Sequence, residues 1–480
     1  MASRSTLTAK NLEALGAARL AALLMDVVSG DAALKRRLRL ELAADNPAEL
    51  SKQIRKRLAA LSAARSFVDW KQARALIADL DTQRAAIVEK VGKADPSEAL
   101  DLLWTFMALA DPVYQRCDDS NGAVGAVFHQ ACADLGRLAA EAKPGPIILA
   151  EHVHEALLAN HHAQFDHLID ACAGALGETG MNHLKQRMLA LSAEPVVKPP
   201  AKERVKIGWS IAGPIYADEI EESSRKSTAR MALLKIAEIQ NDVDAYIAQH
   251  DRKTRTVPGI AANIGLRLLT AGRADEALAI LDAADRPKRP ESAWPDFAWE
   301  DARIAVLDAL GRGEAAQAAR WACFERSLSV PHLRAYLKKL PDFDDFEAEQ
   351  RALDHADAFP SPLLALWFHV CWPALDRAAK LVTAHAVGLD GDYYDILSPA
   401  AEALAAKHPL AATLALRAMI DFTLANGRSS RYQHAARHLK ECASLASAVG
   451  DCRPFETHDA YVARLKAVHG RKHGFWSLVN

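Results

Sequence analysis

Apolar residues recur at helical spacing along most of this chain. In the first segment they are three to five positions apart, with adjacent pairs, which is the pattern of one apolar helix face. Gly30 ends this pattern, and the Asp45-Asn46-Pro47 breaker ends the next one. The apolar positions of the first segment are Leu12, Leu15, Leu20, Leu23, Leu24, Val27 and Val28. The chain is therefore predicted to begin with a series of short helices.

The same periodicity predicts further helices up to about residue 192. Pro96 suits the first turn of a helix, because a proline there removes no helical hydrogen bond. The predicted stretches are Pro96–Ala110, Ala123–Ala140, Ile147–Asn160 and Met181–Leu191. Residues 1–192 are accordingly assigned to an N-terminal helical array.

The pattern changes in residues 193–228, which form the candidate linker. Three prolines come first, and apolar residues then alternate with polar ones, as in a strand. The prolines are Pro195, Pro199 and Pro200, and the alternating positions are Val205, Ile207, Trp209 and Ile211. Because no partner strand is evident, we expect an extended segment lying on a helical surface.

Residues 260–287 carry the most specific pattern of the chain. Small residues stand where two helices would cross closely, and glycine stands where the chain would turn, as in a tetratricopeptide-type pair. The positions are Ile264, Gly265, Leu268, Gly272, Ala277, Leu281 and Ala284. A second copy keeps the turn around Gly311 but matches poorly outside it, and a third keeps the helix after Gly427 but lengthens the turn. Residues 229–480 are therefore predicted to form a tetratricopeptide-like array, and the whole chain an all-α helical-repeat fold, or α-solenoid.

Composition adds limits to this picture. Of the 480 residues, 50% are apolar and 25% charged, and the net charge is −2, so the whole molecule has no bulk attraction to nucleic acid or to an anionic membrane. The longest charge-free apolar stretch, Ser361–Leu375, is shorter than a membrane span and contains two prolines. The 7 cysteines form no C-x-x-C pair. We expect free thiols in a reducing cytoplasm, most of them in the core.

Three residues near the end of the chain are candidate metal ligands. His434, His438 and Cys442 are spaced i, i+4, i+8, so a helix would carry them along one stripe. Ala435 stands where an H-E-x-x-H site has its glutamate, and Cys442 occupies an apolar position of the repeat pattern. Metal binding and ordinary core packing both remain open for this stripe.

Basic residues cluster near the beginning of the chain. Residues 1–70 contain twelve Lys or Arg and seven Asp or Glu, a local charge of +5. Arg36, Arg37, Arg55 and Arg57 would lie on two neighbouring helices and could bind phosphates. The alternative is a solvated helix surface whose long side chains cover apolar neighbours.

Five segments resemble an uncharacterised bacterial domain family whose C-terminal half is tetratricopeptide-like. They are residues 310–312 (LGR), 332–345 (HLRAYLKKLPDFDD), 372–375 (WPAL), 408–413 (HPLAAT) and 471–476 (RKHGFW). The resemblance covers nearly the whole chain, but it implies no activity, because that family has none assigned. The C-terminal half also resembles helical regions attached to SWIM-type zinc fingers. The C-x-C and C-x-H elements of the finger are missing here, so no zinc is implied.

The architecture favours a cytoplasmic protein-interaction or scaffold module that holds a protein or peptide partner, without a cofactor, catalytic residues or a membrane. A nucleic-acid-associated protein using the basic helices is the first alternative. A metal-dependent enzyme built on His434 and His438 is the second. The closing residues 469–480 are expected to fold back and seal the last helical pair, since an uncapped repeat leaves apolar surface bare.

Overall fold

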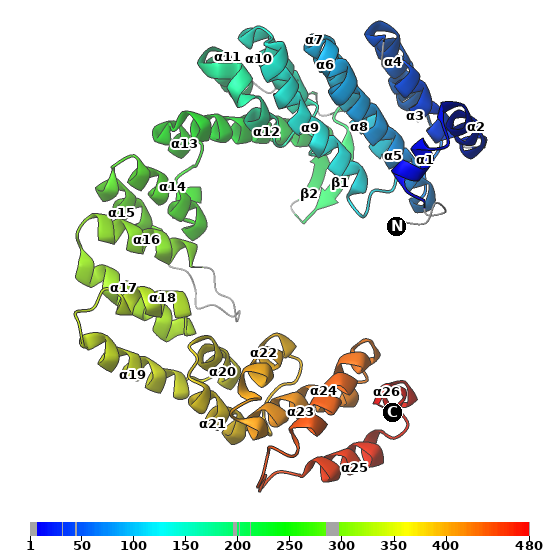
Figure 1. Ribbon diagram of the computed structural model, residues 1–480. Helices are drawn as coiled ribbons and strands as arrows, with labels where there is room; N and C mark the ends of the chain where they lie inside the picture. The colour runs from blue at the N-terminus through cyan, green and yellow to red at the C-terminus, as the bar shows by residue number, and fades with distance from the viewer. Residues whose placement is uncertain are drawn as a thin grey trace. The chain divides into compact units, whose positions relative to one another are not determined.

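The computed structural model describes residues 7–30, 32–43, 46–194, 199–200, 202–211, 213–284 and 297–479. The chain is predominantly α-helical, as the sequence predicted (Figure 1). Two compact units follow one another along the chain, unit 1 from Met1 to Gln249 and unit 2 from His250 to Asn480. No helix within the described ranges is long and apolar enough to cross a membrane.

Unit 1 contains thirteen α-helices, one π-helical turn and one hairpin within the described residues. They are α1 (Ala9–Glu13), α2 (Ala17–Val27), α3 (Ala32–Leu42), α4 (Pro47–Ala63), α5 (Trp70–Ala86), η1 (Ile87–Val91), α6 (Gly92–Ala94), α7 (Pro96–Met107), α8 (Ala110–Tyr114), α9 (Ala123–Ala142), α10 (Pro146–Leu158), α11 (Leu168–Ala193), β1 (Lys206–Ser210), β2 (Gly213–Tyr216), α12 (Ala217–Gln240) and α13 (Val243–Ala248).

Unit 2 is helical wherever it has regular structure in the described part. Its elements are η2 (Thr254–Thr256), α14 (Pro258–Thr270), α15 (Ala274–Asp282), α16 (Ala298–Ala309), α17 (Gly313–Ser327), α18 (Val330–Leu337), α19 (Asp344–Asp357), α20 (Pro362–Cys371), α21 (Leu375–His385), α22 (Tyr394–Leu404), α23 (Pro409–Ala425), η3 (Ser429–Arg431), α24 (Tyr432–Leu445), α25 (His458–His469) and α26 (His473–Val479).

Local sequence signals explain where several helices begin. The side chain of Asn46 accepts a hydrogen bond from the backbone N–H of Glu49, and Pro47 occupies the first turn of α4. Asp95 caps α7 in the same way, with Pro96 in the first turn. These side chains satisfy amides that have no partner inside the helix, which fixes the start of each helix. The predicted helix beginning at Pro96 is confirmed.

The core of unit 1 lies between α4, α7, α9, α10 and α11, with the C-terminal part of α12 added to it. α9 and α11 approach closely at Gly136, where an added Cβ would come within 2.1 Å of the carbonyl oxygen of Ala171. Leu233 and Ile236 of α12 are buried in this core. The boundary between the units therefore follows α13. The sequence-based assignment placed the boundary earlier, at residue 229, because apolar periodicity does not show which neighbour a helix packs against.

The predicted linker contains a β-hairpin, which corrects the expectation of an extended segment without a partner strand. β1 and β2 are antiparallel, and Ser210 pairs with Gly213. The partner strand is only four residues long and includes Gly213-Pro214, a pair more typical of turns than of strands. Trp209 is 71% exposed, so the alternating apolar residues do not all cover a helical surface. Pro195 lies outside the described residues.

Three helix ends of unit 2 share one turn geometry. Gly272, Gly311 and Gly427 all have positive φ, which glycine adopts without strain. In each turn, the N–H of the following arginine donates to the carbonyl five residues earlier, at 2.8, 2.9 and 3.1 Å for Arg273, Arg312 and Arg428. The predicted turns at Gly272 and Gly311 are confirmed, and after Gly427 the connection is longer, as predicted, because η3 precedes α24.

The core of unit 2 extends over α17 to α26. α26 packs against α24, and Phe475 is fully buried there. The expectation that the chain end folds back onto the preceding helices is confirmed for the described residues to 479. The cysteines are free, and all except Cys371 are buried, as core thiols should be.

Candidate functional site

The four candidate phosphate-binding arginines lie on α3 and α4 of unit 1, and three of them contact carboxylates. Arg36 and Arg57 both donate to Asp79, and Arg36 does so at 3.3 Å. Arg55 donates to Glu98 at 2.8 Å. Arg37 is exposed. These ion pairs reduce the positive charge that the surface offers to phosphates, and nucleic-acid binding stays a prediction.

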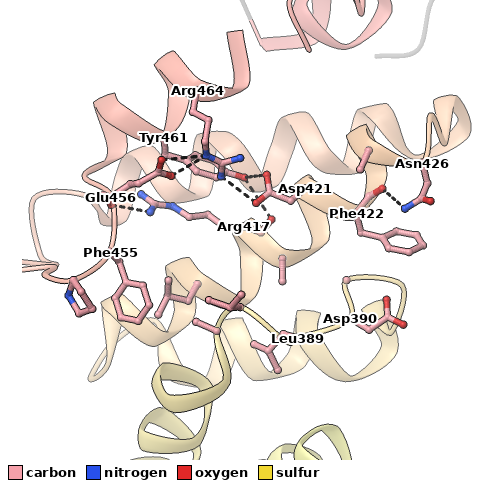
Figure 2. Close-up of a pocket in the computed structure, with 17 residues that line it drawn as sticks. Leu389, Asp390, Arg417, Asp421, Phe422, Asn426, Phe455, Glu456, Tyr461 and Arg464 are labelled. Atoms are coloured by element: carbon pink, nitrogen blue, oxygen red, sulfur yellow. Dashed lines mark hydrogen bonds and ion pairs between the residues drawn. The ribbon is translucent and has the colours of Figure 1, made fainter. Parts of the chain in front are cut away.

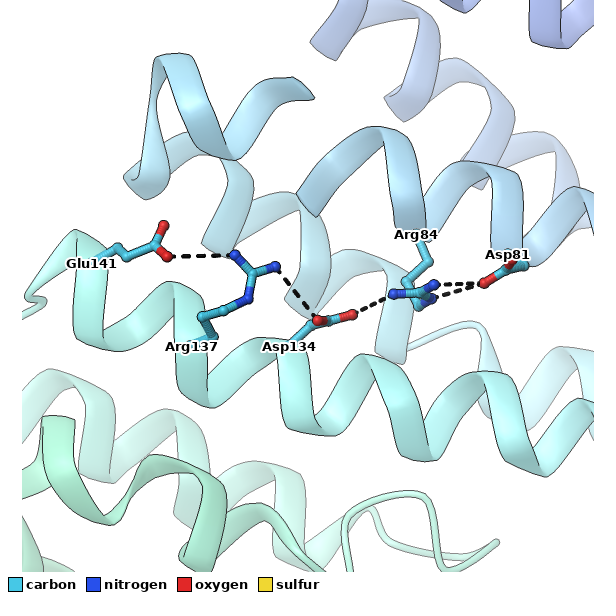
Figure 3. A network of polar contacts seen from close by, with 5 residues as sticks. All are labelled: Asp81, Arg84, Asp134, Arg137 and Glu141. Carbon is cyan, nitrogen blue, oxygen red and sulfur yellow. Dashed lines mark hydrogen bonds and ion pairs between the residues drawn. The ribbon is translucent and has the colours of Figure 1, made fainter. Parts of the chain in front are cut away.

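A second polar network of unit 1 joins α5 to α9 (Figure 3). Arg84 donates to Asp81 at 2.7 Å and to Asp134 at 2.6 Å, and Arg137 reaches both Asp134, at 3.5 Å, and Glu141, at 3.4 Å. Burial lowers the pKa of Arg84, but the hydrogen bonds that it donates to two carboxylates raise the pKa by more, so the net shift is upward. Every charge in this network has a partner, which indicates a structural role.

The three candidate metal ligands of α24 have different surroundings. His434 is exposed and His438 is buried, and both line one cavity. Cys442 is fully buried, 3.9 Å from the carbonyl oxygen of Thr413, and burial raises its pKa to about 12. Among the described residues, no group of three or more His, Cys, Asp or Glu side chains is arranged to hold a metal ion. Helical spacing predicted that the two histidines lie on one face of the helix, where both line the cavity. Cys442 lies in the apolar core instead.

A groove of unit 2 with charged residues in its lining, hereafter the α23 groove, has a volume of about 680 Å³ (Figure 2). It lies between α23, the loop before α22, and the segment that leads into α25. Its apolar lining includes Val387, Phe422 and Phe455. Its charged lining consists of Asp390, Arg417, Asp421, Glu456 and Arg464.

The polar wall of the α23 groove is fixed by hydrogen bonds around Tyr461. The hydroxyl of Tyr461 donates to Asp421 at 3.0 Å, and Arg464 donates to Asp421 at 3.2 Å and to Glu456 at 3.0 Å (Figure 2). The guanidinium carbons of Arg417 and Arg464 lie 4.4 and 4.9 Å from the centre of the Tyr461 ring. Burial, and then the charge of Asp421, raise the pKa of Tyr461, so it stays a neutral hydrogen-bond donor.

Arg417 is the most unusual group of this wall. It is only 8% exposed, and one guanidinium nitrogen donates to the backbone oxygen of Glu456 at 2.8 Å. Its Nε is buried and has no hydrogen-bond partner in the described structure. A buried donor without a partner is costly, so this arginine is held in the wall at an energetic cost.

Sequence reasoning did not find this groove. One signal was present, since Arg417 is the only charged residue in the apolar run from Pro409 to Ile420. Its partners are far away in sequence, with Glu456 39 residues and Tyr461 44 residues later. No local motif connects such positions.

Comparison with known proteins gives a family but no function. Neither the curated proteins nor the solved structures contain a match to this chain. Residues 2–478 match a family described as a family of unknown function, DUF6880. The chain belongs to this family of unknown function, which covers nearly its whole length.

Proposed function

We propose that this chain is a helical-repeat interaction protein, with a tetratricopeptide-like array in unit 2, and that it acts in a reducing, cytoplasmic compartment. The recurrence of one turn geometry after Gly272, Gly311 and Gly427 supports the repeat. At the first of these pairs, an added Cβ on Gly265 would lie 2.9 Å from Leu281, so the small residue permits close helix crossing. The free cysteines support the compartment.

The observation that carries the proposal is the α23 groove, which we assign to an extended segment of a protein partner. A peptide backbone carries both donors and acceptors, so it can pair with the charged residues of both signs that line the groove. The apolar side of the groove offers Val387, which is 102% exposed, to an apolar side chain of the partner.

Charge favours a basic or neutral peptide over an acidic ligand. Three carboxylates and two guanidiniums line the α23 groove. Asp421 and Glu456 have Arg464 as a partner, whereas Asp390 is exposed and takes part in no ion pair of the described structure. We therefore expect the bound segment to combine a Lys or Arg, which would face Asp390, with a neighbouring apolar residue.

Selection from a random peptide library on the full-length protein tests this function. We expect enrichment of peptides that pair a basic with an apolar residue, and saturable binding of the selected peptides by fluorescence polarisation. Ala425→Trp fills the groove from the exposed end of α23 and should weaken that binding at least about tenfold. Asp390→Asn should weaken it by up to about fivefold, as for an exposed charge pair.

Ala443→Trp is the matched control, because Ala443 is exposed on α24 and does not line this groove. The Ala443→Trp protein should bind the peptides as the unchanged protein does. Absence of enriched peptides, or equal binding by the Ala425→Trp and Ala443→Trp proteins, would contradict the proposal.

A further inference from the structure

A second cavity of unit 2, hereafter the α24 pocket, lies at the beginning of α24. Its volume is about 390 Å³, and residues of α22, α23, η3 and α24 line it together with Gly391. The polar lining residues are Tyr394, Ser398, Thr423, Ser430, Arg431, His434, Arg437 and His438. The remaining lining residues are Gly391, Met419 and Ala435.

The lining of the α24 pocket is basic and contains no carboxylate. Arg431 donates to Asp392, outside the lining, at 2.5 Å, and its guanidinium carbon lies 5.0 Å from the centre of the Tyr394 ring. Arg437 has only a distant ion-pair contact in the described structure, 3.6 Å from Glu441 on the same exposed face. This arrangement attracts an anion and repels a metal cation, and arginine is not a usual metal ligand.

The beginning of α24 adds to this positive potential. The helix has 14 residues, and no side chain caps its first turn. The N-terminus of a helix carries free N–H groups and a partial positive charge, both of which favour anions such as phosphate. Ser430 and Arg431 lie immediately before this end and line the pocket.

A buried histidine is the independent sign of a ligand. His438 is only 5% exposed, lines the pocket, and its Nδ1 is buried without a hydrogen-bond partner in the described structure. Burial, and then the charges of Arg437 and His434, lower its pKa to about 4. The ring is therefore neutral near pH 7, and a neutral imidazole can donate one hydrogen bond to a bound oxygen.

We propose that the α24 pocket binds the phosphate group of a small phosphorylated molecule. Arginine pairs well with phosphate, and Thr423, Ser430 and His438 add potential hydrogen-bond donors to the lining. Tyr394, Met419 and Ala435 offer an apolar surface to the organic part of the ligand. This site is separate from the α23 groove, although Gly391 lines both.

Calorimetric titration of the full-length protein with phenyl phosphate, and separately with inorganic phosphate, tests the proposal. We expect saturable binding of both and tighter binding of phenyl phosphate. Arg437→Gln should weaken the binding of both about tenfold, because it removes one charged donor. The exposed Arg437 has no close partner whose loss would disturb the fold.

Lys440→Gln removes the same charge from the exposed face of α24 outside the pocket, and should leave both affinities unchanged. Ala425→Trp should also leave them unchanged, because Ala425 lines only the other site, so this result separates the two proposals. The proposal is overturned if benzoate binds as tightly as phenyl phosphate, if the Arg437→Gln and Lys440→Gln proteins bind equally, or if no titration saturates.

Discussion

Tyr461 shows how single side chains hold the α23 groove in shape. Its ring is 1% exposed, and two arginines lie against it, while its hydroxyl donates to Asp421. A carboxylate acceptor makes this hydrogen bond stronger than one between neutral groups. The tyrosine on α25 therefore connects this helix to Asp421 on α23, and the polar wall of the groove includes residues of both helices.

We expect Tyr461→Phe to lower the free energy of unfolding by about 1–2 kcal/mol, because the ring remains but Asp421 loses one donor. Urea denaturation followed by circular dichroism measures this change. Tyr393→Phe is the control, because Tyr393 is 48% exposed, and it should change stability by less than about 0.5 kcal/mol. Equal effects of the two substitutions would show that the hydroxyl of Tyr461 does not stabilise the wall.

His438 gives a pH-dependent prediction. Its pKa is lowered to about 4 in the folded protein, chiefly by burial, whereas an unfolded chain has a histidine pKa of about 6.5. Between about pH 4 and about pH 6.5, the unfolded state therefore binds more protons at this histidine than the folded state does. This group leaves stability unchanged above about pH 6.5 and reduces it as the pH falls towards about 4.

Urea unfolding at about pH 7 and about pH 5 measures this linkage. We expect His438→Gln to lose less stability between the two conditions than the unchanged protein does. His434→Gln, which alters the exposed histidine one turn earlier, should keep nearly the full pH dependence. If the two variants lose the same stability between the two pH values, the burial of His438 does not cause the pH dependence.

The sequence predicted the shared face of His434 and His438, because a spacing of four residues fixes it within one helix. It did not predict that Tyr394, Ser398 and Thr423 would line a pocket with them, since this depends on how α22, α23 and α24 pack. Arg417 and Tyr461 are likewise joined only by the tertiary fold. Residue chemistry was therefore predictable within a helix and not between helices.

Helix contacts in unit 1 depend on small residues at crossing points. Gly136 of α9 faces the backbone of α11 at Ala171. A side chain there would meet backbone atoms, which cannot rotate away as a flexible side chain can. The two helices would have to separate along their contact.

We therefore expect Gly136→Ala to lower the free energy of unfolding by at least about 2 kcal/mol, since overpacking forces backbone shifts. Thermal and urea denaturation measure it. Gly174→Ala in α11 is the matched control, because no atom lies within 4 Å of the added Cβ. Alanine should stabilise that helix by up to about 1 kcal/mol. Destabilisation of similar size at both sites would contradict the assigned role of the α9–α11 contact.

Elements with a strong local signal were predicted well, and those that depend on a partner were not. Gly272, Gly311 and Gly427 marked turns because a positive φ favours glycine. The strand partner of Lys206–Ser210 was missed, since the short Gly213–Tyr216 segment has too few residues to show alternation. The amphipathic pattern of α12 indicated a helix but not that it completes the first core.

At the scale of the whole molecule, each unit has an apolar core of its own among the described residues. One extends from Leu40 to Ile236, within unit 1, and the other from Phe324 to Phe475, within unit 2. A unit with its own core has the main requirement for folding alone. The boundary after Gln249 should therefore be a permissible place to divide the chain.

We expect residues 1–249 and residues 250–480, produced separately, to be helical and each to unfold in one cooperative transition. Circular dichroism during urea denaturation tests both fragments. Division after Lys143 is the control, because it separates α9 from α11 and exposes the apolar faces that meet at Gly136. Fragments 1–143 and 144–480 should aggregate or lack a cooperative transition over residues 144–249. The boundary is wrong if the control fragments fold as well as the pair divided after Gln249, because the core of unit 1 would then not need α9 and α11 together.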